Sequence, residues 1–434
     1  MSYKQRVIRT IRCQNKNVIG TLAKVISAIS SLEGDIGAIK TVSLGAFHNT
    51  RDITVAFRDV ELLDRVLHAL KDIPEVTVLA VIDEVMELHR GGKLLITPRY
   101  PVTSSDDLQK VYTPGVAAVC THIQDHPEAI REYTTVGKTV AIVTNGSRVL
   151  GLGNIGPAAA MPVMEGKAAL FAQFAGLSMI PILCNTLDVD LFVETVVTIA
   201  GTFAAIQLED IRTPDCFEIE RKLIDRLPIP VMHDDQHGTA VVSLAATINA
   251  CREAGIDLKK ATVGQLGLGA AGSSIARLIM EYTGNAVYGT DLQPHLLERF
   301  KKMGGHPLAD NEAVMKKADV VIATTGKPDI IKPEMVKKGQ IILALSNPYP
   351  EISIVDATNA GAAFASDGSR VNNLLGYPGI LKGAVEGGAK QITREMYLAA
   401  VHAIVALTPD KELLPDPLKP ELHAAVAKAV ARAC

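Results

Sequence analysis

Gly267-Leu268-Gly269-Ala270-Ala271-Gly272 follows a strand-like run, residues 261–267, and precedes an apolar pattern with helical spacing, residues 273–282. In such a turn, the first glycine permits the tight bend, the second lets the backbone approach a pyrophosphate, and the third lets helix pack on strand. The pyrophosphate then lies at the helix N-terminus, where free N–H groups favour anions. The stretch therefore predicts a dinucleotide-binding unit. Its predicted cofactor-binding residues are Gly267, Gly269, Ala270, Ala271 and Gly272.

An acidic residue follows at the place where the ribose of such a cofactor is bound. Asp291 ends the next strand-like run, residues 286–291, and lies 291 − 267 = 24 residues after Gly267. Its carboxylate can accept hydrogen bonds from the ribose hydroxyls and would repel a 2′-phosphate. Leu292 and Gln293 supply no cation that would offset this repulsion. The sequence therefore predicts NAD, rather than NADP, as the cofactor.

Strand and helix patterns alternate on both sides of this turn. The other strand-like runs are residues 138–143, 179–183, 204–208, 320–324 and 340–345. Alternation of this kind is typical of α/β folds with a parallel sheet. We therefore predict an α/β substrate domain at residues 93–237. A Rossmann-type doubly wound parallel sheet, followed by C-terminal helices, is predicted at residues 238–434.

The first part of the chain has a different pattern. Its strand- and helix-like runs follow the order βαββαβ and lie at residues 6–13, 18–32, 37–44, 52–57, 61–70 and 75–82. This order is typical of a ferredoxin-like α+β domain. The pattern breaks at His89-Arg90-Gly91-Gly92-Lys93, which we interpret as a linker. Residues 1–88 are therefore predicted to form a separate domain.

This N-terminal region resembles the ACT domains that sense amino acids in metabolic enzymes. The resemblance rests on its topology and on Asn17-x-x-Gly20-x-Leu22 at the first strand-to-helix turn. It implies a regulatory domain that binds a small-molecule effector. The alternative is a plain dimerisation or packing domain without a ligand.

Composition limits the kinds of partner. Lys and Arg number 44 against 47 Asp and Glu, for a net charge of −3, and aromatic residues make up 4%. These values favour a small-molecule substrate over nucleic acid. Six scattered cysteines without a C-x-x-C pair indicate free thiols in a reducing compartment. The N-terminus has no apolar signal segment, and the longest apolar stretch, residues 193–206, is shorter than the ~20 residues of a membrane helix. We expect a cytoplasmic protein that does not enter a membrane.

A second G-x-G-x-x-G match, Gly151 to Gly156, lacks the context of a nucleotide site. Pro157 and Pro162 are expected to interrupt the helix that should follow it, and no acidic residue ends a strand at the right distance. We interpret this match as a tight loop.

Two acidic pairs follow apolar strand-like runs. Glu209-Asp210 comes after residues 204–208, and Asp234-Asp235 comes shortly after residues 229–232. The carboxyl ends of parallel strands are where α/β proteins bind their ligands. Clustered carboxylates there predict a site for Mg²⁺ or Mn²⁺. For either pair alone, a helix cap or a solvated turn is the alternative.

Five motifs, taken in order, resemble malic enzymes of the bacterial type, and the similarity extends from about Gly92 nearly to the C-terminus. The motifs are Tyr112-Thr113-Pro114-Gly115-Val116, Val149-Leu150-Gly151-Leu152-Gly153-Asn154-Ile155-Gly156, Met164-Glu165-Gly166-Lys167, Leu208-Glu209-Asp210-Ile211 and His233-Asp234-Asp235-Gln236-His237-Gly238-Thr239. The resemblance implies a homodimer or higher homo-oligomer that converts malate to pyruvate and CO₂ with NAD and a divalent metal. Decarboxylation of oxaloacetate is a further activity open to such a site.

The resemblance also implies roles for individual residues. Lys167 would be the general base, Tyr112 the general acid, and Asp234 the residue that orients Lys167. The implied metal ligands are Glu209, Asp210 and Asp235, and the implied substrate-binding residues are Arg148, Asn347 and Asn373. To accept the proton of the malate C2 hydroxyl, Lys167 needs a pKa lowered from ~10 toward ~7–8. We expect burial and the adjacent cation to lower it and Asp234 to oppose the fall.

The sequence is also compatible with two other functions. An ACT-regulated dehydrogenase that does not decarboxylate would not need carboxylates at two strand ends, so a metal requirement would argue against it. A non-catalytic metabolite sensor built on a Rossmann fold would show no turnover with any 2-hydroxy acid.

Overall fold

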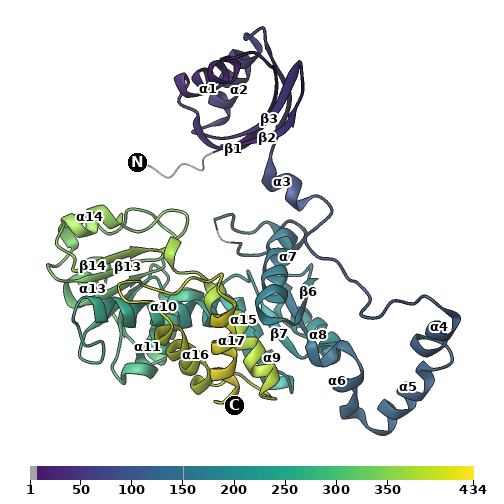
Figure 1. The fold of residues 1–434 in the computed structure, drawn as a ribbon. Helices are drawn as coiled ribbons and strands as arrows, with labels where there is room; N and C mark the ends of the chain where they lie inside the picture. Colours follow the sequence, from purple (N-terminus) through teal and green to yellow (C-terminus); the bar gives the residue numbers. More distant parts are fainter. Residues whose placement is uncertain (1–6, 150) are drawn as a thin grey trace. The chain divides into compact units, whose positions relative to one another are not determined.

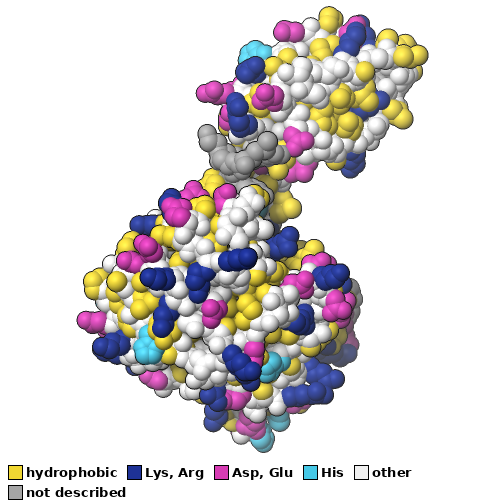
Figure 2. Space-filling model, turned by 90° about the vertical axis from the view of Figure 1, so that its left-hand side faces the viewer, with side chains coloured by type: hydrophobic (Ala, Val, Ile, Leu, Met, Phe, Trp, Pro, Cys, Tyr) yellow, Lys and Arg dark blue, Asp and Glu magenta, His cyan; other side chains and the backbone are white. Residues whose placement is uncertain are grey.

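The computed structural model describes residues 7–149 and 151–434, which belong to two compact units, Met1–Lys93 and Leu94–Cys434 (Figure 1). Arg6, at the start of the first predicted strand, and Leu150, in the second glycine motif, lie outside the described residues. On the face shown in Figure 2, basic and acidic side chains are interspersed. None of the described helices is both long enough and apolar enough to cross a membrane.

The first unit is a four-stranded antiparallel sheet with two helices on one face (Figure 1). Its elements are β1 (Val7–Lys16), α1 (Thr21–Ser31), β2 (Asp35–Leu44), β3 (His48–Phe57), α2 (Val60–Lys71), β4 (Val76–Ile82) and α3 (Glu84–His89). The strand order β2-β3-β1-β4 is the ferredoxin-like order, so the predicted α+β fold is confirmed. Ile53, Val55 and Phe57 alternate along β3 and are fully buried, because one face of the sheet meets the helices.

The turn that carries the ACT-like motif is held by local hydrogen bonds. The Asn17 side chain donates to the Gly45 carbonyl at 3.1 Å and accepts from the side-chain amide of Asn49 at 3.0 Å. Gly20 precedes α1 with φ +89°, a backbone conformation that glycine adopts without strain. These bonds give the motif a structural role, and the effector stays a prediction.

The second unit begins with short helices and continues into a parallel sheet with the order β6-β5-β7-β8. Its elements are α4 (Ser105–Val111), α5 (Val116–Asp125), α6 (Ile130–Tyr133), β5 (Thr139–Thr144), α7 (Gly156–Ala175), β6 (Ser178–Leu183), α8 (Val189–Ile199), β7 (Ala205–Leu208), α9 (Asp215–Arg226) and β8 (Val231–His233). Short 3₁₀ turns lie at Pro127–Ala129, Thr135–Lys138 and Ala200–Thr202.

The helix α10 (Asp234–Glu253) leads into a six-stranded parallel sheet with the order β11-β10-β9-β12-β13-β14. The remaining elements are β9 (Val263–Leu266), α11 (Ala270–Thr283), β10 (Tyr288–Thr290), α12 (Pro294–Lys302), β11 (His306–Pro307), α13 (Asn311–Lys317), β12 (Val320–Ala323), β13 (Ile341–Ala344), α14 (Ile354–Asn359), β14 (Phe364–Asp367), α15 (Tyr377–Glu386), α16 (Arg394–Ala406) and α17 (Pro420–Ala431), with 3₁₀ turns at Pro333–Met335, Gly368–Arg370 and Asn373–Leu375. This strand order is that of the doubly wound Rossmann sheet, so the predicted fold class is confirmed. The predicted boundary between residues 237 and 238 falls inside α10, and the division of this unit into two domains stays a prediction.

One expectation about local structure is wrong. Pro157 and Pro162 were expected to interrupt the helix after the second glycine motif, yet α7 runs through both of them. Pro157 lies in the first turn, where a missing N–H costs nothing. Pro162 lies on the exposed side, and the helix continues past it because its other face is buried through Met164 and Phe171. Packing therefore outweighs the hydrogen bond that Pro162 cannot make.

Candidate active site

Three carboxylates meet where β7 and β8 end. Glu209 and Asp210 follow β7, and Asp235 lies in the first turn of α10, directly after β8. Because these parallel strands are neighbours, their carboxyl ends adjoin, and one oxygen from each carboxylate lies within 4.8 Å of the others. The Asp210 amide donates to Asp235 Oδ2 at 3.0 Å and fixes the two loops together. The structure thus assembles the three predicted metal ligands.

Electrostatics favour a cation at this cluster. Glu209 is 2% exposed and Asp210 is 5% exposed. Burial, with the neighbouring charge of Asp235, raises the pKa of Glu209 and raises the pKa of Asp210 to about 7. Asp210 Oδ2 is also buried without a hydrogen-bond partner among the described residues. Buried carboxylates that repel one another and leave an oxygen unsatisfied fit a hard divalent cation.

Lys167, on α7, lies beside this cluster. Its Nζ is 2.7 Å from Glu209 Oε1 and makes a second, short ion pair with Asp234 Oδ2. Burial lowers the pKa of Lys167, but Asp234 and Glu209 outweigh burial and raise it well above its usual value. The protein's own groups therefore raise the pKa of Lys167, whereas a general base requires a lowered pKa. The predicted fall depended on a neighbouring cation, which would offset the charge of these carboxylates.

Asp234 connects Lys167 to the C-terminal half of the unit. This fully buried carboxylate accepts from Asn373 Nδ2 at 3.3 Å through the oxygen that pairs with Lys167. Asn373 also exchanges hydrogen bonds with the Thr239 hydroxyl. The structure thus brings Asn373, predicted as a substrate-binding residue, next to Asp234 and Lys167, and the roles of these three residues stay predictions.

Two residues that the sequence did not single out support this site. The Tyr377 hydroxyl donates to the Lys167 carbonyl at 3.0 Å, and its ring centre lies 5.2 Å from Lys167 Nζ. In the sequence, the only indication that Tyr377 belongs to the site is its position four residues after Asn373. Glu220, on α9, is buried and accepts from the His233 amide at 2.8 Å and from the His237 ring at 3.0 Å. Burial favours the neutral form of Glu220, but His237 and His233 lower its pKa below its usual value.

The glycine-rich turn has the geometry that its sequence predicts. Gly267 has φ +83°, and a Cβ on Gly272 would lie 1.9 Å from the Gly267 carbonyl oxygen. A Cβ on Gly269 would meet open space, which leaves room for a ligand at the N-terminus of α11. Asp291 Oδ2 accepts from the Leu268 amide at 2.7 Å. The turn and the acidic residue therefore lie together at the carboxyl ends of β9 and β10.

Arg148 and Asn347 are exposed residues in the loops after β5 and β13, and the neighbours of Arg148, Ser147 and Val149, are buried. The Arg148 amide donates to the Asp210 carbonyl at 3.0 Å, which fixes its loop beside the acidic cluster. Asn347 joins Pro348 through a cis peptide bond, and its side chain lies against Gly368. The structure places both residues at strand ends and leaves their side chains accessible to a substrate.

Tyr112 is not brought to this cluster by its own chain. Its side chain is 68% exposed, and its hydroxyl has no hydrogen-bond partner among the described residues. It ends α4, in a segment from residue 95 to residue 128 in which no residue is buried. No contact between Tyr112 and Lys167 is seen among the described residues of one chain, and the role of Tyr112 as general acid stays a prediction.

Comparison with known proteins identifies the family. A model of the malic enzyme N-terminal domain matches residues 92–224, and a model of the NAD binding domain of 6-phosphogluconate dehydrogenase matches residues 262–372. NAD-dependent malic enzyme 1 of Bacillus subtilis is 50% identical over 99% of this chain and 98% of its own length. The chain belongs to the malic enzyme family. The resemblance predicted from the five motifs is thus confirmed.

Other malic enzymes agree over most of the chain. The NAD-dependent malic enzyme of Geobacillus stearothermophilus is 40% identical over 93% of this chain and 88% of its own length. A crystal structure of the NAD-dependent malic enzyme of Thermotoga maritima is 36% identical, with a TM-score of 0.76, over 81% of this chain and 99% of that one. Membership of the malic enzyme family argues against the predicted alternative of a non-decarboxylating dehydrogenase.

Proposed function

We propose that this chain catalyses the oxidative decarboxylation of malate to pyruvate and CO₂, with reduction of NAD. The observation that carries the proposal is the Lys167 amino group held between Glu209 and Asp234, next to the carboxylates of Asp210 and Asp235. A base beside a divalent-cation site suits removal of the C2 hydroxyl proton. The names of the similar malic enzymes from two bacilli support the choice of substrate and cofactor.

The chain's own groups account for the proton transfers. Lys167 Nζ takes the C2 hydroxyl proton while hydride leaves C2 for the nicotinamide, and malate becomes oxaloacetate. The C3–C4 bond then breaks, CO₂ leaves, and Tyr112 protonates C3. Tyr112 recovers its proton from Lys167, which returns both groups to their starting state. A Mg²⁺ or Mn²⁺ ion at Glu209, Asp210 and Asp235 would supply Lewis-acid chemistry at the substrate oxygens. Asp234 orients Lys167, and Arg148, Asn347 and Asn373 bind the substrate.

The preference for NAD should depend on Asp291. We expect Asp291→Ala to lower the ratio of kcat/KM for NAD to kcat/KM for NADP. The Asp291 carboxylate lies against the turn at Leu268 and repels a 2′-phosphate, and the substitution removes this repulsion. Glu298→Ala, which removes an exposed charge from α12, is the matched control and should leave the ratio unchanged. A wild-type enzyme with the higher kcat/KM for NADP would contradict the assignment.

We further propose that Tyr112 serves the active site of a second copy of this chain. The segment around it exposes a row of large apolar side chains, which water disfavours and a partner surface would cover. These are Leu95, Ile96, Tyr100, Leu108 and Val111. Most soluble oligomers are symmetric homo-oligomers, so a second copy is the natural partner. A symmetric dimer would supply each Lys167 with the partner's tyrosine.

Mixed dimers test this exchange. Tyr112→Phe and Lys167→Ala chains, each nearly inactive alone, should regain about a quarter of wild-type activity after equal mixing and subunit exchange, because half of the dimers then carry one intact site. Mixing Lys167→Ala with Asp235→Asn should restore nothing, since both of these groups come from one chain. If the first mixture is no more active than its components, Tyr112 acts within its own chain.

A further inference from the structure

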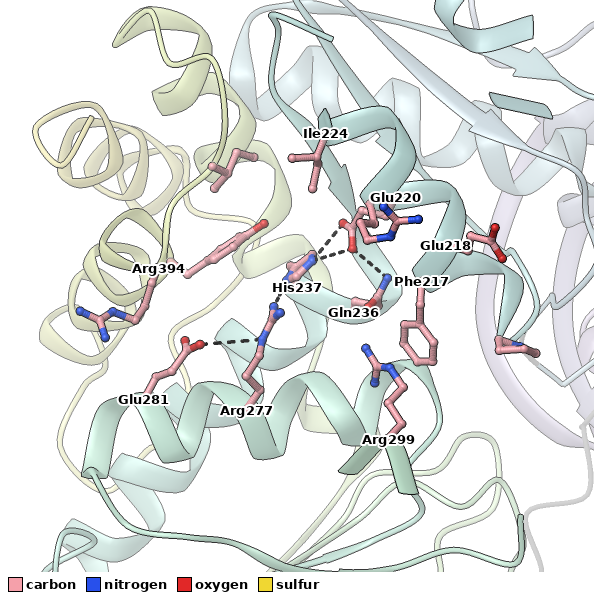
Figure 3. Close-up of a pocket in the computed structure, with 14 residues that line it drawn as sticks. Phe217, Glu218, Glu220, Ile224, Gln236, His237, Arg277, Glu281, Arg299 and Arg394 are labelled. Carbon is pink, nitrogen blue, oxygen red and sulfur yellow. Dashed lines mark hydrogen bonds and ion pairs between the residues drawn. The ribbon is translucent and has the colours of Figure 1, made fainter. Parts of the chain in front are cut away.

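A cavity of about 710 Å³ lies between α9 on one side and α11, α12 and α16 on the other, and Gln236 and His237 of α10 also line it (Figure 3). Its volume lies within the range of small-molecule sites. None of the three carboxylates, Lys167 or the glycine-rich turn lines it. The proposed catalytic groups therefore leave this cavity without a function.

Four arginines line the cavity. Arg221 and Arg394 pair with Asp225 and Glu395, whereas Arg299 and Arg277 lack a close ion pair among the described residues. The Arg299 guanidinium, from α12, lies 3.5 Å from the ring centre of Phe217, and its Nη1 is buried with no hydrogen-bond partner among the described residues. Burial, and then the like charge of Arg277, lowers the pKa of Arg299. A buried donor left unpaired costs free energy that an anionic ligand would recover.

Arg277, from α11, is only loosely held. Its Nη2 donates to His237 Nδ1 at 3.3 Å, and its Nε lies 3.9 Å from Glu281 (Figure 3). Ile224, Ile392 and Tyr397 add apolar surface to the wall of the same cavity. The lining thus combines these two guanidinium groups with surface suited to a carbon skeleton.

We propose that this cavity binds a small organic dianion, a dicarboxylate or a phosphate ester, through Arg299 and Arg277. Guanidinium groups bind both carboxylate and phosphate through paired N–H donors. Three acidic residues also line the wall, and each has other partners. Glu281 lies 3.9 Å from Arg277, Glu218 pairs with Lys222, and Glu220 accepts hydrogen bonds from the His233 amide, Gln236 and His237.

The cavity is connected to the catalytic groups through α10. Arg277 contacts His237, His237 contacts Glu220, and Glu220 holds the His233 amide two residues before Asp235. A dianion that draws Arg277 away from His237 would loosen this chain of hydrogen bonds at the start of α10. We therefore expect its binding to change the affinity for malate, an expectation that rests on the proposed function.

Direct binding to the full-length chain tests the site without relying on turnover. Inorganic phosphate and succinate are titrated separately in a calorimeter at constant ionic strength. We expect Arg299→Gln to weaken binding of at least one probe about tenfold or more, as expected for loss of a charged hydrogen-bond donor. Lys301→Gln, an exposed charge on the same helix, is the control and should not weaken it. The probe affected by Arg299→Gln identifies the class of anion.

The two possible failures are distinguishable. If neither probe binds, or if Arg299→Gln binds both as tightly as wild type, the site does not exist. For the connection to catalysis, the probe should change the KM for malate severalfold in wild type and much less in Arg299→Gln. An equal change in both proteins would place the probe at the active site and overturn the connection. Binding that depends on Arg299 in a chain without malate turnover would refute the proposed reaction and keep the anion site.

Discussion

Lys167→Ala should severely lower kcat both for malate oxidation and for the reduction of oxaloacetate by NADH, whereas Tyr112→Phe should spare most of the ketone reduction. Lys167 is required for both because the group that removes the hydroxyl proton in one direction donates it in the other. Tyr112 is required only when C3 is protonated after CO₂ has left. Each substitution should lower kcat for malate by the ~10²–10⁴ typical of a proton-transfer group.

Comparing the two reactions in the two variants distinguishes the roles of Lys167 and Tyr112, and does not merely show that both residues are needed. Lys167→Ala also removes a charge that pairs with Glu209 and Asp234, so its folding should be checked by thermal unfolding. Lys260→Ala, which removes an exposed ion pair with Asp257 away from the active site, is the matched control and should keep both reactions. Equal loss of ketone reduction in Tyr112→Phe and Lys167→Ala would show that the proposed division of labour is incorrect.

Asp235→Asn should eliminate turnover while NAD binding persists. The amide keeps the size of the side chain and can still accept from the Asp210 amide, but it removes one of three charges at the cation site. The glycine-rich turn lies on another loop, so nucleotide binding should be unaffected. Activity is measured as NADH and pyruvate formation with Mn²⁺ or Mg²⁺, and cation and NAD binding are measured by titration.

Asp225→Asn is the control for this substitution, because Asp225 is exposed on α9 and pairs with Arg221 on the same helix. It should leave turnover and cation affinity unchanged. Full activity of the wild-type enzyme in excess EDTA would remove the basis for a metal-dependent reaction. So would an Asp235→Asn enzyme that retains wild-type kcat.

Local features of the sequence determined much of the fold and part of the site. The glycine-rich turn predicted the Rossmann sheet because only residues without side chains fit at Gly267 and Gly272. Alternating apolar residues predicted strands such as β3 because one face of that sheet is buried. The acidic pairs could be placed at strand ends because each pair follows a short apolar run that predicts a buried strand.

Only the tertiary structure decided what depends on contacts between distant residues. Asp234 and Lys167 are 67 residues apart in the chain, and their ion pair, rather than burial, sets the direction of the Lys167 pKa. α7 passes through Pro162 because its buried face is packed, which the local sequence does not reveal. The sequence around Glu220 indicates only a helix, and the tertiary structure buries its carboxylate against the start of α10. Sequence periodicity records which side of an element is buried, but the charges and donors that then meet a side chain come from other elements and are fixed only when these pack.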